Sequence, residues 1–226
     1  MLTGMIRRAA KLAGLVYFCV LAIFMSAAGA AEVQLIDDFN RGLSPHWQNQ
    51  QFSGLTDYSI VELDGESVLQ AKSEAAASAL VFEKGYRLDD YPILSWRWKI
   101  AAVLPRGDAR SKAGDDYPAR IYVVFPHWNP LQTRSINYIW ANKLPLGAQV
   151  PSLYTANSVM IAAQSGAEKA GRWVSERHNV LEDYRQVFGE DPPAVGAIVI
   201  MSDSDDTGDS TQGWYDDIRI EKASGR

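Results

Sequence analysis

Short segments in which apolar and polar residues alternate recur along the chain, with turn signals between them. Residues 95–100 and 120–125 are two examples, and in the first Trp96 and Trp98 alternate with Arg97. Successive side chains of a β-strand point to opposite faces, so each segment predicts a strand with one apolar face. Many such segments at short intervals favour an all-β chain over a helical one.

Other segments add detail to this fold. Tyr58–Leu63 and Ser67–Ala71, joined by Asp64-Gly65, predict a hairpin. The apolar run Ala194–Met201 predicts a buried central strand. One helix is predicted, Leu181–Phe188, because its apolar residues share a face at helical spacing and a glycine follows. We therefore expect a jelly-roll-type antiparallel β-sandwich with one short helix.

The first 30 residues have the pattern of a targeting segment. Three cations precede the apolar run Leu12–Met25, and small residues follow as far as Ala30. This pattern predicts a secretory signal peptide cleaved near Ala30, and therefore a periplasmic or secreted protein. The alternative is an uncleaved N-terminal anchor. Residues 31–226 are predicted to form a single β-sandwich domain.

Composition excludes several classes of function. Loss of the signal removes three of the 22 Lys and Arg residues and none of the 27 Asp and Glu residues, so the net charge changes from −5 to −8. An acidic chain without a basic cluster argues against nucleic acid and anionic membrane surfaces. Cys19 is the only cysteine, so disulfides, thiolate catalysis and cysteine-bound zinc are excluded from the mature chain. We expect no membrane span there, because no second long apolar segment is present.

Five motifs are distributed along the chain: GDDYPARIYVVF (Gly114–Phe125), NYIWAN (Asn137–Asn142), ERHNVLEDYRQVFG (Glu176–Gly189), IMSDSDDTGD (Ile200–Asp209) and WYDDI (Trp214–Ile218). In these motifs the chain resembles the bacterial domain-of-unknown-function family 3047, from Asp37 to Ile220. The resemblance implies an exported bacterial domain without an established activity, and it carries over no catalytic residues. The opening Asp-Phe and closing Tyr-Asp-Asp-Ile segments also resemble the terminal strands of jelly-roll carbohydrate-binding modules, which implies a similar fold and a structural calcium near the termini.

A polar sheet face is the first candidate site. If the alternating strands lie side by side, their cationic, amide and aromatic side chains converge on one face. Such a face suits a polyhydroxylated or acidic ligand, because sugars stack on aromatic rings and Arg can hold a carboxylate. The alternative is an ordinary solvated sheet face. The predicted ligand-binding residues are Arg97, Lys99, Arg120, Tyr122, Asn137, Glu176, Trp128 and Trp173.

The tryptophans divide by position. Those on apolar strand registers are predicted to be core residues, namely Trp96, Trp98 and Trp140. Those near turns are candidate sugar platforms, namely Trp47, Trp128 and Trp173.

Acidic loop residues are candidate ligands for a structural calcium, which prefers six to eight oxygens. The predicted metal ligands are Asp203, Asp205, Asp206 and Asp209. The loop is not an EF-hand, because Trp214 stands where the bidentate Glu would be, and a solvated acidic turn is the alternative. If the terminal strands pair, a second candidate oxygen cluster comprises Asp37, Asp38, Asp216 and Asp217, although alternation lets at most one of the last two join a given site directly. A third acidic pair, Asp115 and Asp116, either faces Arg120 or orders its own loop.

Three functions remain open from the sequence. The leading hypothesis is non-catalytic binding of a carbohydrate or envelope glycan, and the second is a polysaccharide lyase or hydrolase that uses the same face. For the enzyme, the proton-transfer candidates are His178, Tyr122 and Glu176. The third is a structural periplasmic protein that binds another protein. No nucleophile elbow, phosphate loop or dinucleotide fingerprint is present, which favours binding over catalysis.

Overall fold

The computed structural model describes residues 32–223. The predicted signal peptide, Cys19 and the cleavage position lie outside the described residues. Between Glu32 and Ala223, no helix is long and apolar enough to span a membrane. The strands are β1 (Val33–Asp37), β2 (Trp47–Ser53), β3 (Asp57–Leu63), β4 (Glu66–Glu74), β5 (Ala77–Tyr86), β6 (Ile93–Ile100), β7 (Arg120–Phe125), β8 (Arg134–Ala141), β9 (Gln149–Pro151), β10 (Ser158–Ser165), β11 (Val174–Asn179), β12 (Val195–Asp203) and β13 (Ser210–Glu221).

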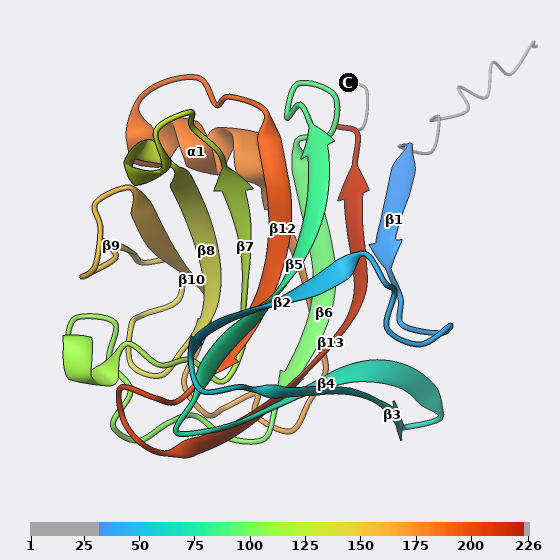
Figure 1. Ribbon diagram of the computed structural model, residues 1–226, viewed down its shortest axis with the longest axis vertical. Coiled ribbons are helices and arrows are strands. Elements are labelled where there is room, and N and C mark those ends of the chain that lie inside the picture. Colours follow the sequence, from blue (N-terminus) through green and yellow to red (C-terminus); the bar gives the residue numbers. More distant parts are fainter. Residues whose placement is uncertain (1–31, 224–226) are drawn as a thin grey trace, which may run out of the picture.

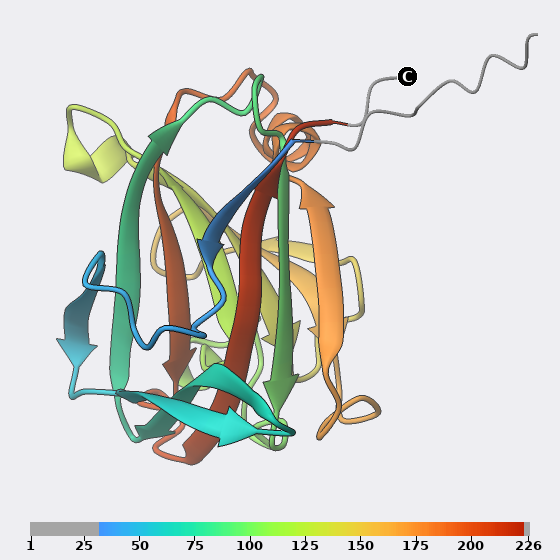
Figure 2. The ribbon, with the colours of Figure 1, turned by 90° about the vertical axis from the view of Figure 1, so that its right-hand side faces the viewer.

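The strands form two sheets that face one another (Figures 1 and 2). The six-stranded sheet has the order β11-β6-β13-β4-β3, and β1 pairs with β13. The seven-stranded sheet has the order β2-β5-β12-β7-β8-β10-β9. Every described pair is antiparallel except β8 with β10, which run parallel. The predicted all-β sandwich is confirmed, with one parallel pair that the sequence pattern did not indicate.

The local predictions also hold. β3 and β4 form the predicted hairpin, and Asp64 (φ 56°) and Gly65 (φ 87°) make its two-residue turn. Between residues 32 and 223 the one α-helix, α1 (Val180–Phe188), ends at Gly189, whose φ of 71° is readily adopted by glycine. β12, which contains the apolar run, lies between β5 and β7 and is largely buried.

Aromatic side chains dominate the core between the sheets. Trp96 and Trp98 point inward from β6, and Trp140 points inward from β8. The ring centroids of Trp98 and Trp140 are 5.8 Å apart, so the two sheets contact directly through these rings. The prediction that these three tryptophans are core residues is confirmed. Burial of large apolar side chains of this kind is the main term that stabilises such a sandwich, at about 1.5–3 kcal/mol each.

The buried hydroxyl of Tyr215 joins the two sheets at the first residue of β7. The Tyr215 hydroxyl, on β13, accepts a hydrogen bond from the Arg120 backbone N–H at 3.0 Å and donates one to the Met201 carbonyl at 2.7 Å. Close approach of the backbones makes this contact possible: a Cβ on Gly213 would lie 2.5 Å from the Pro118 carbonyl oxygen. Only glycine fits at that point of β13.

Replacement of Tyr215 by Phe removes this hydroxyl and leaves the buried Arg120 N–H without its acceptor. An unsatisfied buried donor costs about 1–3 kcal/mol. We therefore expect Tyr215→Phe to lower the free energy of unfolding by that amount in urea denaturation. Tyr91→Phe is the matched control, because the Tyr91 hydroxyl bonds Glu32 at the surface. Equal stabilities of the two variants would contradict this role for Tyr215.

Candidate ligand-binding site

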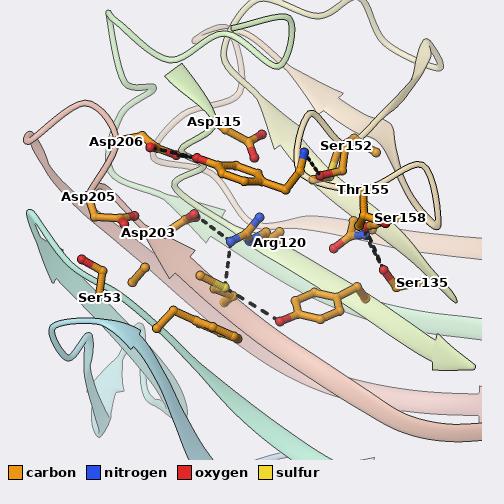
Figure 3. A pocket seen from close by; sticks show the side chains of 17 residues that line it. Ser53, Asp115, Arg120, Ser135, Ser152, Thr155, Ser158, Asp203, Asp205 and Asp206 are labelled. Carbon is orange, nitrogen blue, oxygen red and sulfur yellow. Dashed lines mark hydrogen bonds and ion pairs between the residues drawn. The ribbon is translucent and has the colours of Figure 1, made fainter. Parts of the chain in front are cut away.

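A pocket of about 390 Å³ opens on the outer face of the seven-stranded sheet, away from the core. On β7, Ile121 and Val123 face the core while Arg120 and Tyr122 face the pocket. Figure 3 shows Arg120 near the centre, with Asp203 and Asp205 on one side and Ser135 and Ser158 on the other. The floor comes from the sheet and the walls come from loops. The lining residues are Phe52, Ser53, Ala77, Asp115, Arg120, Tyr122, Ser135, Asn137, Ser152, Tyr154, Thr155, Ser158, Met160, Met201, Asp203, Asp205 and Asp206.

Arg120 is the cation at the centre of the pocket. Its residue is 9% exposed, and its Nη2 donates to the Asp203 carboxylate at 2.7 Å. Burial by itself would lower the pKa of Arg120, but the adjacent Asp203 carboxylate raises it, so the guanidinium stays charged. Its Nε is buried and has no hydrogen-bond partner among residues 32–223. The guanidinium therefore keeps a donor that the described protein does not satisfy.

Carboxylates surround this cation. Burial raises the pKa of Asp115, and it also raises the pKa of Asp203, where the neighbouring carboxylates of Asp116 and Asp115 add to the effect and Arg120 opposes it. The Asp115 carboxylate accepts from the Tyr117 hydroxyl at 2.7 Å. Asp116 accepts from the backbone N–H of Thr207 at 2.6 Å. The loop that follows β12 is therefore tied to the loop that precedes β7.

Tyr154 forms the rim of the pocket. It is 60% exposed, and its hydroxyl donates to the Asp206 carboxylate oxygens at 2.9 and 3.0 Å. Burial and this carboxylate raise the pKa of Tyr154 to about 12. The Lys112 ammonium lies 5.3 Å from the ring centroid. The ring is thus held at the pocket mouth while much of its surface stays accessible.

Neutral polar groups line the opposite wall. The Asn137 amide donates to the Ser158 hydroxyl at 2.8 Å and to the Ser135 hydroxyl at 3.1 Å. Tyr122 lies beside them, and burial raises its pKa to about 12. Both pocket tyrosines therefore stay protonated at neutral pH and can donate hydrogen bonds, but neither is suited to act as a base.

Arg97 and Lys99 lie on the other sheet. The prediction that they share one face with Arg120 and Asn137 is wrong, because residues 101–119 cross from β6 in the six-stranded sheet to β7 in the seven-stranded sheet. Alternation within a strand fixes the face of each residue but not the sheet to which the strand belongs. Arg97 forms ion pairs with three carboxylates, those of Glu66, Asp216 and Asp217.

The three tryptophans predicted as sugar platforms lie in different parts of the molecule. Trp47 is buried in the core and its indole donates to Asp37 at 2.8 Å, so its prediction as an exposed platform is wrong. Trp173 packs against the Arg97 guanidinium, 4.9 Å from its ring centroid. Trp128 is 88% exposed on the loop after β7, at the end of that strand opposite Arg120. Trp128 and Trp173 therefore do not line the pocket.

Glu176 and His178 come together, as their shared strand face predicted, but between the sheets. Glu176 accepts from the Trp98 indole at 3.2 Å and from the Gln164 amide at 2.8 Å. The His178 ring lies 4.4 Å from the Tyr138 ring, and its Nε2 lies 3.6 Å from the Glu176 carboxylate. This pair links the two sheets and is separate from Tyr122, so the three proton-transfer candidates do not form one site.

The predicted metal ligands divide into three environments. Asp203 and Asp205 offer oxygens within 4.8 Å of one another and of Asp116. Asp206 instead accepts from Tyr154, and Asp209 forms an ion pair with Arg106 at 2.6 Å. The terminal strands do pair, yet Asp216 and Asp217 are neutralised there by Arg97.

The donor set fits calcium poorly. Arg120 already supplies a positive charge to Asp203, and backbone N–H groups of Asp206 and Thr207 occupy both oxygens of Asp116. A calcium ion beside the guanidinium would be repelled by it, and it would still need further oxygens.

The sequence pattern did not predict the pocket residues that lie on loops. Tyr154, Ser152 and Thr155 lie in the connection between β9 and β10, which has no periodic pattern. Phe52, which is 56% exposed at the end of β2, was also missed. The one available signal was an aromatic residue among small polar residues at 152–158, which is typical of an exposed loop and little more.

The fold resembles that of known carbohydrate-binding modules. The family 11 module of a cellulosomal cellulase of Clostridium thermocellum matches with a TM-score of 0.50 and 12% identity, over 87% of this chain and 98% of the module. The family 30 module of another cellulosomal cellulase of that organism has a TM-score of 0.47 and 12% identity, over 79% and 92%. No curated protein matches the chain. The first likeness shows the predicted jelly-roll fold.

The family assignment rests on the sequence. The sequence model of the family described as "Protein of unknown function (DUF3047)" matches residues 45–219, which are most of the chain. The motifs at Gly114–Phe125 and Ile200–Asp209, which supply Arg120 and the aspartates of the pocket, lie within this match. The chain belongs to the DUF3047 family.

Proposed function

We propose that this protein binds carbohydrate in the pocket on the outer face of its seven-stranded sheet. The observation that carries the proposal is the combination of exposed aromatic rings at the rim with convergent donors and acceptors inside. Tyr154 and Phe52 supply the rings, and Arg120, Asn137 and Asp205 supply the polar groups. Sugar rings have apolar faces and hydroxyl edges, so they match a site of this composition.

The fold adds support by analogy. The solved family 11 module with the same architecture is named as carbohydrate-binding. Proteins with the same fold often differ in function, so this likeness only adds to the support that the geometry of the pocket gives. The signal pattern of residues 1–30 adds the prediction of export, which would place the protein among envelope or extracellular glycans.

The direct test is a binding screen of the protein against a polysaccharide and oligosaccharide panel, with released sugars measured in the same samples. Retention without release supports a binding module. If the protein binds no glycan of a broad panel and releases no sugar from any of them, the result would contradict the proposal and favour the hypothesis of a protein partner.

An aromatic variant ties binding to the pocket. We expect Tyr154→Ala to weaken the affinity for the retained glycan about tenfold or more, because it removes a stacking surface at the rim. The side chain is exposed, so the melting temperature should change little. Tyr91→Ala, at a partly buried tyrosine that lies outside the pocket and bonds Glu32, is the control and should bind normally. Equal affinities of the two variants would exclude Tyr154 from the site.

An enzyme that acts in the same pocket is the second candidate. It is favoured by the raised pKa of Asp115 and of Asp206, which burial causes, because a raised pKa makes a carboxyl a better candidate for a general acid. Sugar release that Asp206→Asn abolishes, with binding retained, would move the assignment from a binding module to an enzyme.

Calcium in the acidic loop is tested separately. We expect the melting temperature to be the same in calcium and in chelator, because Arg120 already neutralises Asp203. A ligand that binds only the folded state must stabilise it, so a clear rise with calcium would show that the ion binds despite Arg120.

A further inference from the structure

The charges of the pocket restrict which sugars it can take. Besides Arg120, its lining carries Asp115, Asp203, Asp205 and Asp206. Arg120 is the one cation of the lining and pairs directly with Asp203, so four carboxylates share a single positive charge. A glycan that bears carboxylate, sulfate or phosphate groups would be repelled from this wall. Arg97, the other candidate for holding an acidic sugar, already forms ion pairs with three carboxylates.

A cationic ligand meets the opposite obstacle. Arg120 lies at the centre of the pocket, and within the described chain its guanidinium donates side-chain hydrogen bonds only through Nη2, to Asp203 and to the Met201 sulfur. An ammonium group cannot accept a hydrogen bond from the guanidinium, and it would be repelled by the guanidinium charge. The pocket therefore calls for a ligand atom that accepts from Arg120 while a neighbouring atom donates to a carboxylate.

The hydroxyl group meets both requirements, because it donates one hydrogen bond and accepts two. Two adjacent hydroxyls on a sugar ring could accept from the guanidinium and donate to Asp205, whose carboxylate makes no hydrogen bond or ion pair within residues 32–223. Figure 3 shows Asp205 on the same side of the pocket as Asp203 and facing the space beside Arg120. Asp206 is less available, since its oxygens already accept from Tyr154.

We propose that the pocket selects an uncharged sugar unit, held by its hydroxyls between Arg120 and Asp205, and rejects acidic and amino-sugar glycans. This inference rests on the proposed carbohydrate-binding function and names the ligand class of the same site.

The test compares glycans that share one backbone and differ in charge. The panel pairs neutral oligosaccharides with their uronic-acid counterparts and with their free-amino counterparts, in several linkages, with affinities measured at low ionic strength, where charge effects are largest. We expect the neutral member of any bound series to bind at least tenfold more tightly than either charged member. An equal or tighter affinity for the acidic or the cationic member would overturn the inference and leave the proposed function standing. Absence of binding across every series would refute both.

A charge-removing variant isolates Asp205. We expect Asp205→Asn to weaken binding of the neutral glycan about tenfold, because hydrogen bonds to a charged acceptor are stronger than those to an amide. Asp57→Asn is the matched control, an exposed carboxylate on β3 of the other sheet. The melting temperature of Asp205→Asn should be unchanged or higher, since a repulsive charge is lost. Normal binding by Asp205→Asn would exclude this carboxylate as the acceptor.

Discussion

The contact between the Tyr215 hydroxyl and the backbone of β7 and β12 positions the candidate site. Tyr215 belongs to the six-stranded sheet, yet its oxygen satisfies the Arg120 N–H and the Met201 carbonyl of the seven-stranded sheet. Both residues send their side chains to the opposite face, into the pocket. The floor of the pocket is therefore fixed by two hydrogen bonds from the interior of the sandwich. A buried polar group of this kind is costly if left unpaired, so it holds the two sheets in one relative placement.

Charge pairing then decides what the two outer faces can do. On the six-stranded sheet, Arg97 forms ion pairs with Glu66 and Asp216 and packs against Trp173, so an acidic ligand would have to compete with carboxylates that are already bound. On the seven-stranded sheet, Arg120 is paired once and is surrounded by more carboxylates than it can neutralise. The sequence predicted a cationic sheet face that would bind acidic glycans. The structure instead has a small pocket in which Arg120 is paired with Asp203, further carboxylates can accept hydrogen bonds, and aromatic rings form the rim.

The sequence predicted the strands and faces well, because alternation is a local property that each strand carries by itself. Trp96, Trp98 and Trp140 were assigned to the core, and the helix and the β3–β4 hairpin were located correctly, on this basis. The partition of strands between sheets was not predictable, since it depends on how residues 101–119 cross the sandwich. The same holds for Tyr154, which reaches the pocket from an aperiodic connection and through a contact with Asp206, 52 residues away in the chain.

The most direct test of this account is hydrogen exchange of the protein with and without a retained oligosaccharide. If the ligand lies in the pocket, exchange should slow in residues 152–158 and 203–206, where Tyr154 and Asp205 lie, and should stay unchanged in β6 and β11. Protection confined to β6 and β11 would place the ligand on the six-stranded sheet and would contradict the central claim.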